Sequence, residues 1–205
     1  MKTEELFASN PNITLIDGGI IGGVPYDKGD SEGKPNWHCP ALIVSGSDPL
    51  PDAELSKVLN MHHLDKPIGA ATGLKMCYAV TTKGFYALAI ESFTTAHELG
   101  VMYELRSYLE RYSPSTLKLA ESGLISMPPK AYRWVHEMFE IADTMAESGG
   151  FDRTLFQGVA EVYRVVAEDT ELGKEQPGAR VRGKTVEDVV TVLSEGMRAK
   201  KLKTD

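Results

Sequence analysis

A lysine near the start of a helical segment is the first candidate for chemistry. Lys75 lies within residues 69–78, GAATGLKMCY, where most of its neighbours are apolar. A lysine in such surroundings loses part of its hydration, which favours the neutral amine that accepts a proton in acid–base catalysis. The alternative is a lysine whose stem lies on apolar surface while its ammonium reaches solvent. The sequence leaves both interpretations open.

A glycine-rich segment upstream, residues 17–25 (DGGIIGGVP), is the second candidate. Gly22 and Gly23 would let the backbone approach a ligand, because no side chain intervenes. The spacing differs from the G-x-G-x-x-G pattern of a dinucleotide-binding loop. A plain glycine-rich turn is the alternative interpretation.

Two further patterns favour ordinary structure. Residues 178–185, GARVRGKT, fit the phosphate-binding pattern G-x-x-x-x-G-K-[ST], but the segment before them does not predict a strand. We expect a basic loop before a capped helix. His62 and His63 are neighbours on an expected strand, so their side chains point to opposite faces and we expect no metal site.

The first third of the chain predicts a small α/β part. Apolar runs at residues 13–16 (ITLI) and 41–44 (ALIV) predict buried strands. Residues 26–39 predict a polar, glycine-rich loop, and Asp52 is placed to cap a short helix over 53–59. Two strands do not make a stable sheet alone, so we expect further strands upstream or from another chain.

After residue 66 the pattern is helical. Apolar residues recur with a helical period through residues 70–99 without a proline, which predicts one helix of about 45 Å ended by Gly100. Such a helix is long enough to connect two domains. Further helices are predicted over residues 102–112 and 115–122, from Pro128 to Gly149, and over 152–169 and 186–198. The predicted fold class is therefore α/β followed by all-α.

Taken together, these segments resemble a known family. IDGGIIGG is similar to the substrate loop of β-hydroxyacid dehydrogenases, D-[AG]-P-V-S-G-G, and GAATGLKMCYA is similar to their catalytic segment, G-x-G-x-x-x-K-x-x-x-N. Residues 74–101 and 129–150 resemble one branch of this superfamily more closely. That branch comprises 6-phosphogluconate-dehydrogenase-like proteins with a helical C-terminal domain of unassigned function. The resemblance covers roughly residues 12–170.

The resemblance implies a fold and an activity. It implies that residues 1–66 are part of a Rossmann-type NAD(P)-binding domain and that residues 67–205 contain the interdomain helix and a helical domain. It implies hydride transfer between NAD or NADP and a small hydroxy acid, or a related carbonyl or imine compound. Lys75 would be the acid–base residue, and Gly22 and Gly23 would offer backbone N–H groups to the substrate.

The sequence departs from the family's pattern at several positions. Ile21 stands where the family has a serine, and Ala79 stands where it has an asparagine, although the adjacent Tyr78 could supply a hydroxyl to the substrate. The family's K-D-L-x-L-A motif falls near residues 137–142, EMFEIA. These departures change the groups that would face a substrate.

The family's glycine fingerprint has no counterpart in this sequence. The first βαβ unit of a Rossmann domain takes about 30 residues, and only about a dozen precede the first expected strand. We therefore expect either a shortened gene product or a protein that has lost cofactor binding. The second case gives an alternative function, a non-catalytic protein that acts by association. The resemblance implies a homodimer through the helical domain.

Composition excludes several classes of partner. The 205 residues include 29 acidic and 22 basic side chains, and a net charge of −7 disfavours binding to nucleic acid. Residues 1–12 contain no apolar core of a secretion signal, and no run of 18 apolar residues predicts a membrane span. Cys39 and Cys77 lack a paired spacing, which is typical of a reducing compartment. We expect a cytoplasmic protein.

Overall fold

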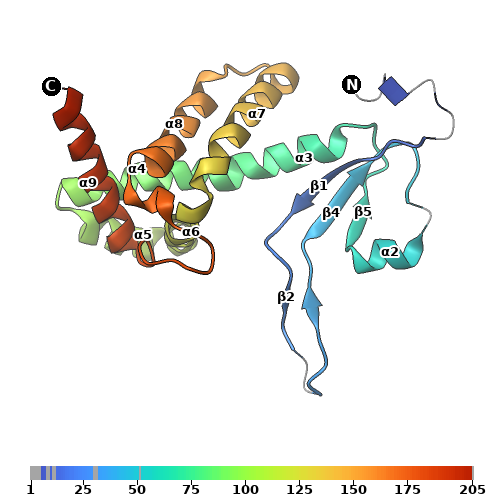
Figure 1. Ribbon diagram of the computed structural model, residues 1–205, viewed down its shortest axis with the longest axis horizontal. Helices are drawn as coiled ribbons and strands as arrows, with labels where there is room; N and C mark the ends of the chain where they lie inside the picture. The colour runs from blue at the N-terminus through green and yellow to red at the C-terminus, as the bar shows by residue number, and fades with distance from the viewer. Residues whose placement is uncertain (1–5, 8–9, 11–12, 30–31, 51, 205) are drawn as a thin grey trace. The chain divides into compact units, whose positions relative to one another are not determined.

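The computed structural model describes residues 6–7, 10, 13–29, 32–50 and 52–204. The chain divides into two compact units, Met1–Tyr78 and Ala79–Asp205 (Figure 1). The domain boundaries that the sequence predicts, 1–66 and 67–205, remain a prediction. Most of the N-terminal segment examined for a secretion signal lies outside the described residues. Among the helices that are described, none has both the length and the hydropathy needed to cross a membrane.

The first unit is built on a small mixed sheet. Its strand order is β1 (Asp17–Ile21), β4 (Ala41–Ser45), β5 (Met61–His63), with β1 antiparallel and β5 parallel to β4. The short helix α2 (Ala53–Val58) connects β4 to β5, as a parallel pair requires. Asp52 caps this helix through a bond from the Leu55 N–H of 2.9 Å, which confirms the predicted cap.

Two local predictions for this unit are wrong. Residues 13–16 are not a strand; the strand begins at Asp17, and Gly18 and Gly19 of the glycine-rich segment pair with β4. Residues 26–39 are not a plain loop. They contain a hairpin of β2 (Tyr26–Asp27) and β3 (Trp37–His38), which extends away from the sheet in Figure 1. The Asp27 carboxylate supports the hairpin by accepting bonds from the N–H groups of Gly29 and Asn36.

The predicted helix over residues 70–99 is helical throughout but is not one α-helix. α3 (Ala70–Ala79) leads into a π-helical turn, η1 (Val80–Gly84), which leads into α4 (Phe85–Glu98). Gly100 follows with φ +72°, and the N–H of Val101 donates to the carbonyl of Ala96. This left-handed ending confirms Gly100 as the helix terminator.

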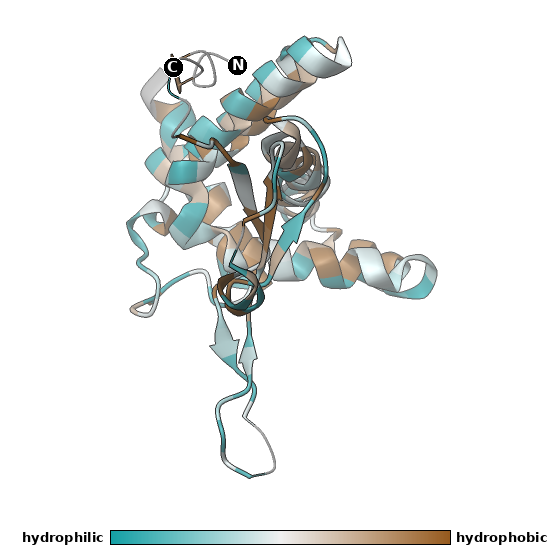
Figure 2. Cartoon of the chain, turned by 90° about the vertical axis from the view of Figure 1, so that its right-hand side faces the viewer, coloured by the Kyte–Doolittle hydropathy of each residue, from teal (hydrophilic) through white to brown (hydrophobic). Residues whose placement is uncertain are grey.

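Helices make up most of the second unit. The predicted helices are present, and the one predicted over 115–122 is longer than predicted, at Pro114–Ser126. The elements after α4 are α5 (Met102–Tyr112), α6 (Pro114–Ser126), η2 (Pro128–Lys130), α7 (Ala131–Gly149), α8 (Thr154–Glu168), η3 (Glu171–Lys174) and α9 (Val186–Thr204). α7 and α8 lie side by side as an antiparallel pair, and Gly150, with φ +73°, ends α7 (Figure 1). Hydrophobic and hydrophilic residues alternate along the helices (Figure 2), as expected for helices with one buried face.

Candidate functional site

The carboxylate of Asp17 holds strand β1 against the start of helix α3. Its Oδ2 accepts hydrogen bonds from the N–H groups of Gly69 (3.1 Å) and Thr72 (2.9 Å) and from the Ser45 hydroxyl (3.1 Å). Its Oδ1 accepts from the Thr72 hydroxyl at 2.5 Å. Burial raises the pKa of Asp17, but the bonds from Thr72, Ser45 and Gly69 outweigh it and hold the pKa below the ordinary value. The ionised carboxylate therefore satisfies the first N–H groups of α3.

Ser45, at the end of the central strand β4, completes this connection. Its side chain is fully buried, and its hydroxyl donates to Asp17 while accepting a bond from the N–H of Ala71 at 3.0 Å. Two strands thus bind the first turn of the helix, which gives the residues of the next turn a fixed position over the sheet.

Lys75 lies in that next turn and packs over β1 at Gly19. A Cβ atom placed on Gly19 would lie 3.1 Å from Cβ and 3.2 Å from Cδ of Lys75, and 3.4 Å from the carbonyl oxygen of Ala71. The lysine stem therefore occupies the space that a side chain at residue 19 would need. Lys75 is half-buried, and no carboxylate among the described residues forms an ion pair with it. Sequence reasoning found Lys75 but not its partner Gly19.

The predicted substrate-binding glycines follow β1 rather than lying opposite Lys75. Gly22 has φ +122°, and a Cβ atom there would meet Pro40 at 3.1 Å, so this position requires glycine. Gly23 has no neighbouring atom within 4 Å of such a Cβ. At about 3.3 Å per strand residue, Gly22 lies about 10 Å along the chain from Gly19. Its role, and that of Gly23, stays a prediction.

Tyr78 is the remaining predicted site residue. It lies three residues after Lys75 on α3, a spacing that makes two helical side chains neighbours. Tyr78 is 47% exposed. The structure therefore brings Lys75 and Gly19 together where β1 passes α3. The role of Tyr78, three residues further along α3, stays a prediction.

The two histidines of β5 have structural partners. His62 contacts the side-chain amide oxygen of Asn60 at 3.1 Å, and His63 contacts the carbonyl of Gly46 at 3.1 Å. In the part of the chain that the structure describes, no three His, Cys, Asp or Glu side chains are grouped to hold a metal ion.

The phosphate-loop pattern at residues 178–185 is already occupied by the chain's own carboxylates. The N–H groups of Val181 and Arg182 donate to Glu175 at 2.7 and 3.0 Å, and the N–H of Gly183 donates to Asp188. A phosphate-binding loop needs these donors for its ligand. The segment is therefore a loop before α9 whose N–H groups are hydrogen-bonded within the chain.

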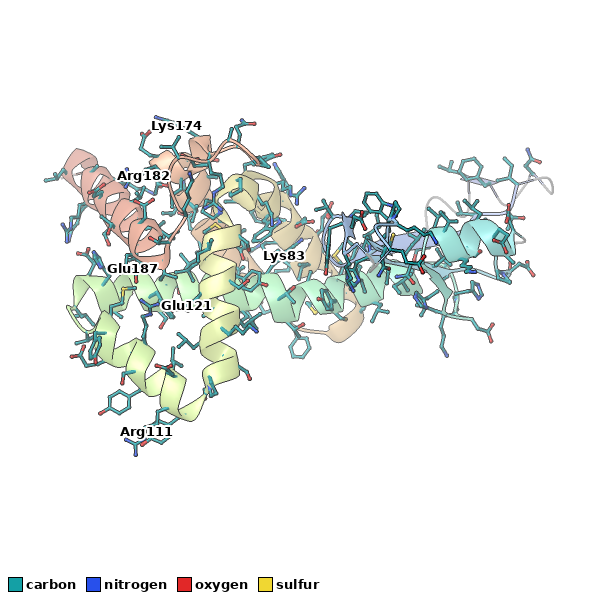
Figure 3. The ribbon with its side chains drawn as sticks, turned by 90° about the horizontal axis from the view of Figure 1, so that it is seen from below. Lys83, Arg111, Glu121, Lys174, Arg182 and Glu187 are labelled. Atoms are coloured by element: carbon teal, nitrogen blue, oxygen red, sulfur yellow. The ribbon has the colours of Figure 1, made fainter. Side chains whose placement is uncertain are left out.

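A second polar cluster, in the helical unit, was not found from the sequence. Lys83, labelled in Figure 3, lies in the π-helical turn and forms an ion pair with Glu137 of α7. Its Nζ lies 5.2 Å from the centre of the Trp134 ring. The Tyr163 hydroxyl donates to the Lys83 carbonyl at 2.5 Å. Burial raises the pKa of Tyr163, with Tyr86 and Glu137 adding to the shift, so this hydroxyl stays protonated. No spacing in the sequence indicates these contacts, because they join residues 50 to 80 positions apart.

Comparison with known proteins places a family match inside the helical unit. The family described as "Domain of unknown function (DUF1932)" matches residues 96–166. No curated protein sequence matches the chain significantly.

Two solved structures are similar over most of the chain. One is a conserved protein of unknown function whose structure is described as revealing similarity with 3-hydroxyacid dehydrogenases. It is 26% identical, with a TM-score of 0.57, over 80% of this chain and 62% of its own. The other, a conserved hypothetical protein from Sinorhizobium meliloti 1021, is 21% identical with a TM-score of 0.63, over 88% of this chain and 57% of its own, and shows the fold alone. The chain thus spans about three fifths of the length of these relatives.

These likenesses support the resemblance to the β-hydroxyacid and 6-phosphogluconate dehydrogenase superfamily. They also confirm the predicted fold class, a small α/β segment followed by a helical part. The relationship to dehydrogenases is general, and it leaves the substrate and the cofactor of this chain to be proposed.

Proposed function

We propose that this protein is an NAD(P)-dependent oxidoreductase of the β-hydroxyacid dehydrogenase type. The observation that carries the proposal is the junction where Lys75 packs over Gly19 and Asp17 binds the first turn of α3. The similarity of one relative to 3-hydroxyacid dehydrogenases supports it. The substrate would be a small hydroxy acid or a related carbonyl or imine compound.

Lys75 is the proposed acid–base residue. Oxidation of an alcohol removes a hydride from carbon and a proton from oxygen, so a base must accept that proton. The neutral amine of Lys75 would accept it, and in the reverse direction its ammonium would return it to the carbonyl oxygen. NAD or NADP would supply the hydride chemistry. Backbone N–H groups of Gly22 and Gly23 and the hydroxyl of Tyr78 are the proposed substrate contacts.

The proposed setting is the cytoplasm, with a small molecule as the substrate and neither nucleic acid nor a membrane as a partner. Cys39 and Cys77 are free thiols, which favours a reducing compartment. The acidic balance of the chain supports the exclusion of nucleic acid. The proposed assignment of residues 1–66 to a Rossmann-type domain and 67–205 to a helical domain follows the same resemblance.

Titration with NADPH and NADH tests the proposal. Nucleotide fluorescence would be followed while the purified 205-residue chain is added, and circular dichroism would verify that the chain is folded. The proposal predicts a saturable signal with at least one of the two nucleotides. A folded chain that binds neither nucleotide would contradict it.

An exposed apolar groove favours a second candidate, a protein that acts by association with a second copy. The groove, of about 610 Å³, lies between α4 and α5. Leu88 and Leu99 on its walls are 56% and 70% exposed. Its lining residues are Leu88, Glu91, Ser92, Thr95, Ala96, Leu99, Val101, Glu104 and Leu105. A homodimer through the helical unit would remove this surface from water.

Light scattering tests the second candidate. We expect the wild-type chain to be a dimer at micromolar concentration and Leu88→Arg to shift it toward the monomer. Leu155→Arg, at a leucine of α8 that is 66% exposed and does not line the groove, is the matched control. A folded wild-type monomer, or equal effects of both substitutions, would rule out a dimer through this groove.

A further inference from the structure

The start of helix α7 carries a lysine beside a buried aromatic ring. Lys130 is the last residue of η2, is half-buried, and has its Nζ 5.9 Å from the centre of the Trp134 ring. Trp134 is 4% exposed and also has Lys83 at 5.2 Å. Two cations therefore approach one ring, an arrangement that the negative π-face partly stabilises.

The positive charge around Lys130 exceeds the negative charge that the described residues provide. Burial lowers the pKa of Lys130, and the neighbouring charges of Arg133, Arg180 and Lys83 lower it further. Glu137 is engaged with Lys83. No carboxylate in the described part of the chain forms an ion pair with Lys130 or Arg133. Such an excess of cations attracts an anion.

Unused hydrogen-bond donors lie among the same residues. Arg180 donates to the carbonyl oxygens of Ile125 and Gly183, yet its Nε is buried and donates to no described acceptor. The Nε1 of Trp134 is likewise buried without an acceptor. Buried N–H groups in proteins almost always have an acceptor, so these two donors indicate a missing one. This observation is independent of the charge balance.

The backbone adds to both features. α7 is 19 residues long, and within the described part of the chain no side chain caps its N-terminus, where Lys130 is the N-cap residue. The N-terminus of a helix carries a partial positive charge and unsatisfied N–H groups, which stabilise a nearby anion. The N–H of Ala131 already donates to the carbonyl of Pro128, so this end of the helix adds mainly its dipole to the side-chain cations.

We propose that Lys130, Arg133 and the first turn of α7 form a binding site for the oxyanion group of a small molecule, a carboxylate or a phosphate, beside Trp134. Arg133 follows Lys130 by three residues, so the two side chains lie within one helical turn. The site lies in the helical unit and uses none of the residues around Lys75. It therefore does not depend on the proposed hydride transfer.

Tryptophan fluorescence offers a direct test, because the sequence contains only two tryptophans, Trp37 and Trp134. In a Trp37→Phe background, Trp134 alone reports on the site. Inorganic phosphate and malonate would be titrated separately at constant ionic strength set with chloride. The proposal predicts a saturable change in Trp134 fluorescence with at least one probe. Tighter binding of phosphate would indicate a phosphate ligand, and tighter binding of malonate a carboxylate.

Charge-removing variants locate the binding. Lys130→Gln and Arg133→Gln should each raise the dissociation constant about tenfold, the effect of losing one hydrogen bond to a charged group. Lys130→Arg should largely retain binding. Lys118→Gln and Arg111→Gln are matched controls at exposed residues of α6 and α5; Arg111 lies far from Lys83 within this unit (Figure 3). No saturable change in the folded protein, or equal weakening in all the glutamine variants, would overturn the proposal.

Discussion

Asp17 is a single carboxylate on which several donors converge. The N–H groups of Gly69 and Thr72 and the hydroxyls of Thr72 and Ser45 all donate to it. Removing the carboxylate would leave these partly buried donors without an acceptor, which costs more than the hydrogen bonds themselves contribute. We therefore expect Asp17 to fix the start of α3 and, with it, the position of Lys75.

Replacement of Asp17 by alanine should lower the free energy of unfolding by about 2 kcal/mol, since a helix cap and several bonds are lost together. Urea denaturation followed by circular dichroism would measure it. Asp48→Ala is the matched control, because Asp48 is exposed and accepts, among the described residues, a bond from the adjacent Ser47 hydroxyl. Equal decreases in the free energy of unfolding of the two variants would contradict a stabilising role of the hydrogen bonds to Asp17.

The same carboxylate predicts a pH dependence. The folded-state pKa of Asp17 is below its unfolded value of 3.8, so its contribution is fully present above that pH and is lost as pH falls through the folded pKa. The stability difference between the wild type and Asp17→Asn should therefore shrink as the solution is acidified below pH 3.8. Free energies of unfolding of both proteins, measured across this pH range, would show whether the difference shrinks in acid. A difference that stays constant with pH would contradict the assignment.

A substitution at Gly19 tests how closely Lys75 packs against β1. Gly19→Ala would place a methyl group 3.1 Å from the Lys75 side chain, so the lysine must shift and the free energy of unfolding should fall by about 1–2 kcal/mol. Gly18→Ala is the matched control in the same strand, because its methyl group would lie 3.5 Å from Val44, an ordinary contact. Thermal unfolding of both variants would show whether residue 19 is the restricted position.

Residue types and spacing were enough to select Lys75, Gly22, Gly23 and Tyr78 as candidates. They could not reveal Gly19 as the residue opposite Lys75, since that depends on how β1 lies beneath α3. They also could not reveal the site at Lys130. Its neighbour Arg180 is 50 residues away and reaches this region through contacts with Ile125 and Gly183.

At the scale of elements, the largest error concerned the first strand. Local propensity favours ITLI at residues 13–16 as a strand over DGGII at 17–21. The strand nevertheless starts at Asp17, where Gly18 and Gly19 pair with β4 and the absence of a side chain at residue 19 leaves room for Lys75 of α3. Packing against a neighbouring helix overrode propensity. The helices of the second unit, whose apolar stripes are regular, were predicted well.

The π-helical turn is a feature that no apolar pattern indicates. The Tyr163 hydroxyl donates to the carbonyl of Lys83 within this turn. Tyr163→Phe should therefore lower the free energy of unfolding by about 1 kcal/mol, since a buried carbonyl loses its donor. Tyr132→Phe, at a side chain that is 64% exposed, is the control and should leave stability unchanged. Chemical denaturation of both variants would measure the difference. An unchanged free energy of unfolding in Tyr163→Phe would show that the bond to the Lys83 carbonyl does not stabilise the fold.

At the scale of the whole molecule, the two units carry different parts of the argument. The family match lies in the helical unit, at residues 96–166, whereas Lys75 and Asp17 lie in the first unit. The fold class was predictable from the sequence, because the pattern of apolar residues changes from strand-like to helical after residue 66. The proposed activity rests on the junction in the first unit, because a fold alone does not define a reaction.

Hydride transfer tests the central claim most directly. The wild-type chain and Lys75→Met would be assayed with reduced nucleotide and a panel of small 2- and 3-keto acids, with nicotinamide absorbance as the readout. Lys66→Met, at an exposed lysine that precedes α3, is the matched control. The account predicts turnover by the wild type and the control, and a loss of about 100-fold or more in Lys75→Met, the usual effect of removing a general acid–base group. No turnover by the folded wild type would contradict the proposed activity, and equal rates in all three proteins would contradict the assignment of Lys75.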